Sequence, residues 1–193
     1  MNPRELLDFL HIAERLKCSK RHCWNPDGGR ESVAEHCWRT ALMADLLREE
    51  FPEVNMDRVI SMCLHHDMGE AVTGDIPVFQ KTETDEAREE TAIRALLAQL
   101  PEPQRERVRN LFAEMQRLQT PEARLYKALD KLEALISHNE AALDTWLPLE
   151  YDLQRTYGLE ATAHHPFLRA LRQAVLQDTE EKIKEADRGT GLP

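Results

Sequence analysis

The chain has 193 residues, a length that fits one domain with a substantial hydrophobic core. Apolar residues make up 41% and charged residues 31%, and seven glycines with few aromatic residues favour helices over sheets. The formal net charge of −10 argues against binding to a nucleic acid polymer or an anionic membrane.

Cysteine usage and hydropathy indicate a soluble cytoplasmic protein with reduced thiols. No pair among Cys18, Cys23, Cys37 and Cys63 has C-x-x-C spacing, so a zinc ribbon is excluded. The charged start "MNPRELLDFL" is not typical of a signal peptide. No apolar run approaches the roughly 18 residues that a membrane span needs. Cys37 and Cys63 are expected in the core, since both lie in apolar helical context.

The first half of the chain predicts three helices separated by loops. Residues 3 to 17 have helical spacing of leucines, and the Asn-Pro and Gly-Gly pairs in residues 18 to 31 predict a loop. Ser32 and Glu35 form a capping box, which starts a helix that runs to about Glu50. Asn55 caps a third helix, which ends near Asp67.

The second half predicts a loop over residues 68 to 82 and then helices over 83 to 99, 104 to 118, 121 to 145 and 166 to 189. Pro121 suits the first turn of its helix. No segment shows the alternation of a strand. The predicted fold is therefore all-α, a helical bundle of about seven to eight helices. Residues 1–193 are expected to form a single domain, with a motif-bearing core over about 5–145 and C-terminal helices over 146–189.

Four polar side chains interrupt apolar helical context. They are His36, the pair His66 and Asp67, and Asp130 inside "LYKALDKLEALI". A carboxylate flanked by leucines needs a partner, because an unpaired buried charge is costly. A divalent cation held by two imidazoles and two carboxylates would satisfy all four groups. This mixed ligand set leaves the metal open among Co, Mn, Mg, Zn and Fe.

These four residues resemble the H…HD…D signature of the HD-domain metal-dependent phosphohydrolases. "ESVAEH", "HHDMGEAVTGDIP" and "KALDKLEAL" look most like the 5′-deoxynucleotidase branch, which removes phosphate from deoxyribonucleoside 5′-monophosphates. The resemblance runs from about residue 5 to 145. It implies an enzyme with a small nucleotide as substrate, and a homodimer.

The resemblance also assigns roles. His36, His66, Asp67 and Asp130 would be the metal ligands. Glu70 would orient or deprotonate the attacking water, and Asp75 would hold the sugar 3′-hydroxyl. Metal-activated water with a nearby carboxylate to accept its proton fits phosphate ester hydrolysis. HD proteins with two metal ions usually have extra histidine ligands between the HD pair and the last aspartate. This chain has no histidine between Asp67 and Asp130, so the resemblance implies one metal ion.

Substrate-binding roles fall on residues outside this set. The family has an Arg–Trp pair upstream, the Arg for phosphate and the Trp to crowd a 2′-hydroxyl. This chain departs from the pair, since Arg21 is followed by His22 and Trp24 comes three residues after Arg21. An Arg can grip phosphate through two donors. Glu114 lies where the branch often has an acidic residue that faces the substrate.

The remaining polar residues have simpler interpretations. His65 is expected to be a helix-end neighbour rather than a ligand, because adjacent helical positions do not face together. His138, His164 and His165 are expected to be surface or helix-end histidines. Glu133, one turn after Asp130, could order a ligand or form a surface salt bridge.

Two alternatives to a monophosphatase stay open on the sequence. The first is an HD-type phosphodiesterase or nucleotide-pyrophosphate hydrolase. Both use the same H…HD…D site, and the altered Arg–Trp region leaves the substrate open between them and a monophosphate. A helical scaffold with a structural metal is the non-enzyme alternative. A structural site would be closed, without further carboxylates, so Glu70 and Asp75 argue against it.

Overall fold

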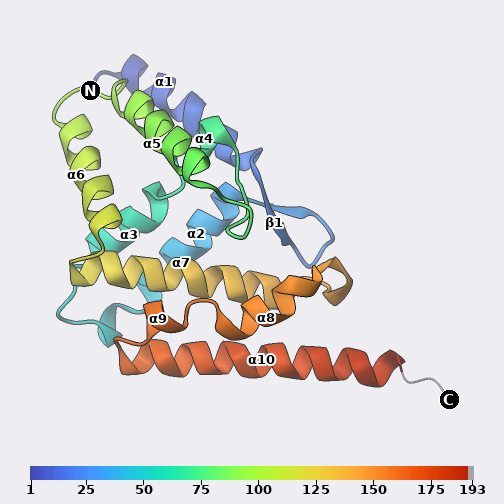
Figure 1. Cartoon of the computed structure of the whole chain (residues 1–193). Helices are drawn as coiled ribbons and strands as arrows, with labels where there is room; N and C mark the ends of the chain where they lie inside the picture. Colours follow the sequence, from blue (N-terminus) through green and yellow to red (C-terminus); the bar gives the residue numbers. More distant parts are fainter. Residues whose placement is uncertain (191–193) are drawn as a thin grey trace. The chain divides into compact units, whose positions relative to one another are not determined.

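The computed structural model describes residues 1–190, and the all-α prediction is confirmed (Figure 1). Eight α-helices of nine or more residues lie in this part of the chain: α1 (Pro3–Ala13), α2 (Val33–Leu46), α3 (Met56–His65), α5 (Glu83–Leu97), α6 (Gln104–Arg117), α7 (Pro121–Glu140), α8 (Pro148–Thr156) and α10 (Pro166–Thr190). Two single-turn helices, α4 (Glu70–Thr73) and α9 (Leu159–Thr162), complete the set. Short 3-10 turns follow α1, α2 and α7. Within residues 1–190, no helix is both long and apolar enough to cross a bilayer.

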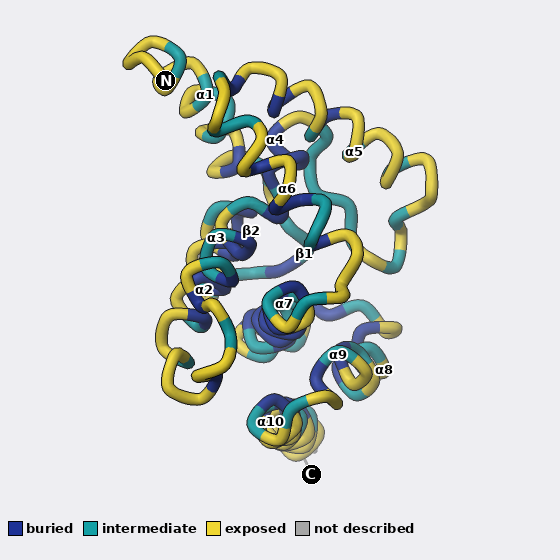
Figure 2. Tube along the Cα trace, turned by 90° about the vertical axis from the view of Figure 1, so that its left-hand side faces the viewer, coloured by how far each residue is buried: buried dark blue, intermediate teal, exposed yellow. Residues whose placement is uncertain are grey.

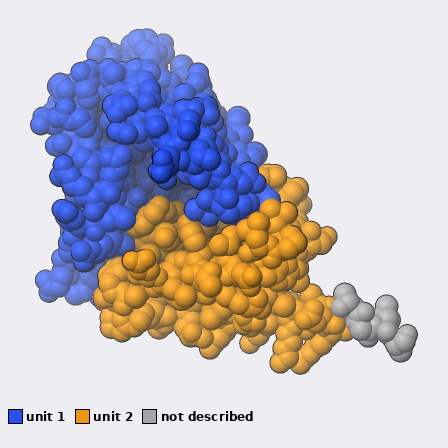
Figure 3. All heavy atoms as spheres, viewed as in Figure 1, with its two compact units in different colours: residues 1–22, 31–126 blue, residues 23–30, 127–193 orange. Residues whose placement is uncertain are grey.

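The chain divides into two compact units, which Figure 3 colours separately. The first comprises Met1–His22 and Glu31–Tyr126, and the second comprises Cys23–Arg30 and the chain from Lys127 onward. Helix α7 runs without a break from one into the other.

The first unit is built around the packing of α2 against α3. Val33, Ala44, Val59, Met62 and Cys63 are fully buried in these two helices. Helix α5 packs on α4 and on α6, so the residues after Asp67 are held against a helix. Cys37 and Cys63 are buried and reduced, as predicted.

The second unit is organised by α10, which contacts both α8 and α9. Its Arg172 is almost fully buried and donates from Nε to the carbonyl of Tyr157 at 3.0 Å and from Nη2 to that of Gln154 at 2.6 Å. These carbonyls lie at the end of α8, where a helix has no partners of its own for them. Arg172 therefore caps α8 from a neighbouring helix.

The prediction of a loop over residues 18 to 31 is wrong. The segment forms a hairpin of β1 (Lys20–Trp24) and β2 (Arg30–Ser32). At its tip the Asn25 amide donates to the carbonyl of Gly29 at 2.7 Å, and Gly28 has a φ of 87°. Positive φ is readily reached by glycine, so the turn signals in "NPDGG" were correctly located. The strands lack alternation because only Cys23 of β1 is buried.

Three other boundaries differ from prediction. The expected loop over 68 to 82 contains the single turn α4, and the helix from Ser32 ends at Leu46 before a 3-10 turn. Helix α7 ends at Glu140 rather than near 145. His138 lies in the last turn of α7, as expected of a helix-end histidine. It is not on the surface, since it is only 8% exposed and its ring stacks on Trp146 with centroids 4.5 Å apart.

Candidate metal and substrate site

Helix α2 presents His36 from its second turn. Ser32 caps the helix: its amide donates to Glu35 Oε2 at 2.6 Å, and its Oγ accepts from the Glu35 amide at 3.2 Å. The side chain of His36 is fully buried. The capping box predicted from the sequence therefore fixes the start of the helix that carries this histidine.

The end of α3 presents His66 and Asp67. Asn55 caps the helix start by accepting from the Arg58 amide at 3.1 Å. His66 follows the last helical residue, and its Nδ1 lies 2.8 Å from the carbonyl oxygen of Cys63. A carbonyl only accepts, so Nδ1 carries the hydrogen, and the neutral ring has its lone pair on Nε2. This is the tautomer of a histidine that binds metal through Nε2.

Three of the four predicted metal ligands converge within the first unit. His36 Nε2 lies 3.2 Å from His66 Nε2, and His66 Nε2 lies 3.2 Å from Asp67 Oδ2. His36 Nε2 is 3.8 Å from the same carboxylate oxygen. Ligand atoms about 2.0–2.1 Å from one ion lie roughly 2.8–3.4 Å apart in octahedral or tetrahedral geometry. Two of the three spacings therefore fit a shared cation, and the third is somewhat longer.

Asp130, the fourth predicted ligand, lies on α7 in the second unit. Its carboxylate is 15% exposed and accepts from Lys127 Nζ at 2.8 Å. The part of Asp130 in the ligand set stays a prediction. Glu133, three residues further on, is fully buried, which excludes a surface salt bridge as its role.

Glu70, at the start of α4, is a buried carboxylate with an unsatisfied oxygen. The residue is 7% exposed, and its Oε2 has no hydrogen-bond partner within residues 1–190. Burial, together with the negative charges of Asp67, Asp75 and Glu89, raises the pKa of Glu70 to about 10, against a smaller opposing effect of Arg21. Carboxylates crowded in this way favour a cation, so the residues present fit the divalent metal that the sequence predicts.

Asp75 follows the turn at Gly74, whose φ is 76°. Its amide donates to Ser19 Oγ at 3.3 Å. Burial raises the pKa of Asp75, and the positive charge of Arg21 partly offsets this. The carboxylate is thus near the same charges as Glu70 without belonging to the ligand cluster.

The predicted substrate-binding pair lies in the hairpin. Arg21 on β1 donates from Nη1 to Glu31 Oε2 at 3.1 Å, and its side chain is 16% exposed. Trp24 belongs to the second unit, where the Arg30 guanidinium lies 5.1 Å from the centre of its ring. The roles of Arg21 and Trp24 therefore stay predictions.

Glu114 is tied to other side chains of the first unit. It forms an ion pair with Arg58 and accepts from Thr120 Oγ1 at 2.6 Å. Burial opposes its ionisation, but the hydrogen bonds from Arg58 and Thr120 hold the pKa of Glu114 below its ordinary value. It lines a separate hollow with Arg117 and Gln119, so a substrate role for it stays a prediction.

His65 is turned away from the cluster. Its Nδ1 lies 2.7 Å from the carbonyl oxygen of Ser61, one turn back in α3. It is thus a helix-end neighbour of His66.

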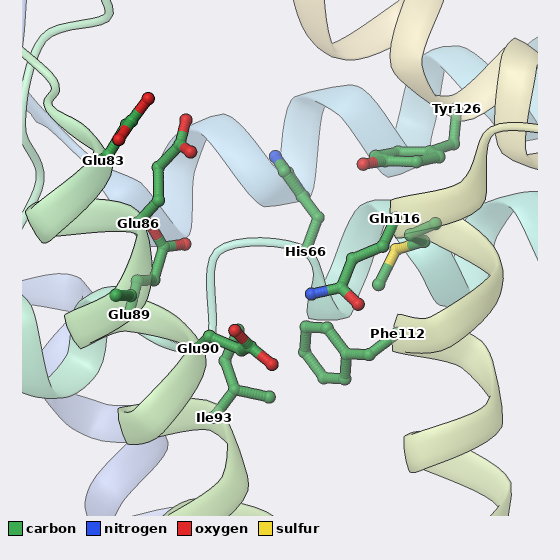
Figure 4. Close-up of a pocket in the computed structure, with 11 residues that line it drawn as sticks. His66, Glu83, Glu86, Glu89, Glu90, Ile93, Phe112, Gln116 and Tyr126 are labelled. Carbon is green, nitrogen blue, oxygen red and sulfur yellow. The ribbon is translucent and has the colours of Figure 1, made fainter.

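A hollow of about 590 Å³ opens beside His66, and the sequence did not predict it (Figure 4). Its lining comes from α5, α6 and the first turns of α7, including Phe112, Gln116 and Tyr126. The Tyr126 ring lies 5.9 Å from that of His66, centroid to centroid. The only sequence signal was the spacing of residues 112, 115 and 116, which share one helix face. The same spacing is typical of a buried core, so it could not identify a hollow.

Comparisons with known proteins identify the family and several relatives of this chain. A family model described as "HD domain" matches residues 13–172. The 5′-deoxynucleotidase HDDC2 of Homo sapiens is 33% identical over 141 residues, which cover 71% of this chain and 68% of that protein. The 5′-deoxynucleotidase hdd1 of Schizosaccharomyces pombe is 28% identical over 184 residues, 91% of each chain. A crystal structure of a predicted metal-dependent phosphohydrolase from Magnetospirillum magnetotacticum matches with a TM-score of 0.76 and 29% identity, over 93% of this chain and 95% of that one.

Proposed function

The chain belongs to the HD domain family, and from this premise we propose that it removes phosphate from deoxyribonucleoside 5′-monophosphates by attack of water. The prediction of an HD-domain hydrolase is confirmed by the family match and by relatives that are named 5′-deoxynucleotidases. The single observation that carries the reaction is the convergence of His36, His66 and Asp67, with the unsatisfied Glu70 carboxylate three residues after Asp67.

We assign the metal to His36, His66 and Asp67, with Asp130 as the fourth ligand. A bound divalent cation supplies Lewis-acid stabilisation of the phosphoryl oxygens and lowers the pKa of water. One ion is proposed, of the set Co, Mn, Mg, Zn or Fe.

The chain's own residues divide the remaining work. A bound cation would oppose the negative charges that raise the pKa of Glu70, so the carboxylate would be ionised and would hold the attacking water and accept its proton. Arg21 offers its guanidinium to the phosphate. Asp75 accepts from the sugar 3′-hydroxyl, and Trp24 crowds the 2′ position.

The test is release of inorganic phosphate from a panel of deoxyribo- and ribonucleoside monophosphates with Co²⁺, Mn²⁺ or Mg²⁺. A chelated sample is the control. We expect turnover of monophosphates that chelation abolishes. Turnover of cyclic nucleotides or guanosine polyphosphates alone would assign the chain to the phosphodiesterase or pyrophosphate-hydrolase alternative.

We further propose a single domain over residues 1–193 that works as a cytoplasmic homodimer on small nucleotides, without nucleic acid or membrane partners. The family match over 13–172 includes residues of both units, which supports one domain. The net charge of −10 supports a small substrate over a polymer. On α2, Trp38 is 61% exposed, Leu42 38% and Leu46 69%, and their i, i+4, i+8 spacing forms an apolar stripe that supports a second copy as partner.

A further inference from the structure

The hollow beside His66 has an apolar wall on α6. Phe112 and Met115 are buried there, while Gln116 is exposed. These positions share one helix face, so the Gln116 amide stands beside an aromatic ring. In Figure 4 this amide extends into the space between His66 and Phe112.

The facing wall on α5 is acidic. Glu86 and Glu90 lie one turn apart across the hollow from Phe112 and Gln116 (Figure 4). Glu90 accepts from Arg94 Nη1 at 2.8 Å. The side chain of Glu86 is exposed and has no ion-pair or hydrogen-bond partner among the residues that the structure describes. An available carboxylate and an available amide therefore face the same space.

A nucleobase matches two such walls. Its faces are apolar and stack on aromatic rings, and its edge carries hydrogen-bonding groups. The volume of about 590 Å³ lies within the roughly 300–1,000 Å³ usual for small-molecule sites. Because the predicted ligand His66 lines the hollow, this space adjoins the candidate metal cluster of His36, His66 and Asp67.

The polar groups on these walls distinguish one base edge from another. A carboxylate only accepts hydrogen bonds, and it accepts from the exocyclic amino group of cytosine. A glutamine amide pairs with the N6 amino group and N7 of adenine. Uracil and hypoxanthine carry a carbonyl oxygen at the corresponding position, which a carboxylate repels.

We propose that this hollow is the base subsite and that Glu86 and Gln116 are specificity-determining residues, which favour bases with an amino group at the 4 or 6 position. The proposal rests on the proposed function, because that function delivers a nucleoside monophosphate to the metal. It adds a base preference that the metal site alone does not supply.

Matched substrate pairs test the proposal directly. dCMP and dUMP differ at the 4 position, and dAMP and dIMP at the 6 position. We expect kcat/KM to be at least about fivefold higher for the amino member of each pair. In Glu86→Gln the dCMP preference should fall toward unity, because a single amide contact can turn and donate to the carbonyl of uracil. In Gln116→Leu the dAMP preference should fall, because the paired bonds to N6 and N7 are lost, a donor and acceptor pair that hypoxanthine does not match.

Glu106→Gln and Gln119→Leu are the controls, since they repeat the same chemical changes at exposed positions outside this hollow. Both should keep the wild-type ratios. A ratio of two kcat/KM values does not depend on the fraction of active enzyme, so partial misfolding of a variant leaves the comparison valid.

Equal kcat/KM values within both wild-type pairs would overturn the proposal, as would ratios that neither variant changes. If no monophosphate is hydrolysed, the proposed function fails separately. Equilibrium binding of deoxycytidine against deoxyuridine then decides the base subsite, with tighter binding of deoxycytidine expected and equal binding overturning it.

Discussion

Glu70 is a buried carboxylate whose surroundings are unfavourable for the stability of the fold and favourable for binding a cation. An unsatisfied buried carboxylate beside Asp67, Asp75 and Glu89 destabilises the fold unless a cation and water occupy the cluster. The burial of this carboxylate therefore indicates a site that binds a cation and water.

Replacing this carboxylate should separate metal binding from turnover. We expect Glu70→Gln to keep the metal and to lose roughly 10²- to 10⁴-fold in kcat, because the proton acceptor is gone while His36, His66 and Asp67 remain. Metal content and phosphate release are the two measurements. Asp67→Ala, the comparison variant, should lose the metal itself, and full activity in Glu70→Gln would refute the general-base role.

The raised pKa of Glu70 also makes the stability of the chelated protein depend on pH. The unfolded chain releases this proton near the ordinary value of 4.5, and the folded protein holds it up to about 10. Between these values the native state binds more protons, so the free energy of unfolding falls as pH rises, by at most about 1.4 kcal/mol per pH unit.

Denaturant unfolding of chelator-treated protein at about pH 6 and about pH 9 measures this slope. Glu70→Gln should reduce the slope, since the amide does not titrate. Both proteins keep the neighbouring charged residues Arg21, Asp67, Asp75 and Glu89. The contributions of these residues to the pH slope therefore largely cancel when the two slopes are compared. An unchanged slope would show that Glu70 ionises normally in the fold.

At the scale of elements, the approach of α4 to α5 depends on one glycine. A Cβ on Gly69 would lie 2.7 Å from Glu89 Cγ, closer than packed atoms allow, and 3.1 Å from Ile93 Cγ1, which is a tight contact. Its φ is −59°, so space rather than backbone freedom requires glycine here.

We expect Gly69→Ala to force α5 outward, to cost about 1–3 kcal/mol of stability and to lower kcat/KM, because Glu70 is the next residue. Gly29→Ala is the control, since its added Cβ would meet only the Asp27 side chain. Thermal unfolding and phosphate release would decide the matter, and equal effects of the two substitutions would contradict a special role for position 69.

The sequence predicted elements wherever the deciding interactions are local. Ser32 with Glu35, Asn55 and Pro121 mark helix starts through contacts within one turn, and each helix begins where they indicate. The hairpin of β1 and β2 was missed because pairing between strands, not alternation, defines it.

Site prediction followed the same division. The sequence could select His36, His66 and Asp67 as candidates because their polarity conflicts with apolar helical surroundings, and the structure brings them together. The burial of His138 and Glu133 was not found, since the groups that accommodate a buried polar side chain come from distant segments. The hollow beside His66 was missed because the sequence pattern around Phe112 and Tyr126 is the same for a core residue as for a residue that lines a hollow.

At the scale of the whole molecule, the apolar stripe on α2 is the feature that argues for self-association. Figure 2 shows buried and exposed positions along each helix, and α2 has both. We expect Trp38→Ser to shift the protein toward monomer in sedimentation equilibrium, because the most extensive side chain of the stripe is lost. Leu159→Ser, at another exposed apolar position, is the control. A wild-type protein that is already monomeric would refute the dimer.

The acidic wall of the hollow has a consequence for the encounter with substrate. A nucleoside monophosphate is an anion, and it must approach a protein of net charge −10 past Glu86 and Glu90. Dissolved salt screens this repulsion, with a Debye length of about 10 Å at 0.1 M. The association rate constant of the monophosphate should therefore increase with ionic strength. For a basic active-site cleft the same rate constant would decrease, because salt would screen the attraction. Stopped-flow binding of a monophosphate across a salt series would reveal this sign, and a decrease would show that Arg21 and the bound cation dominate the field along the path of entry.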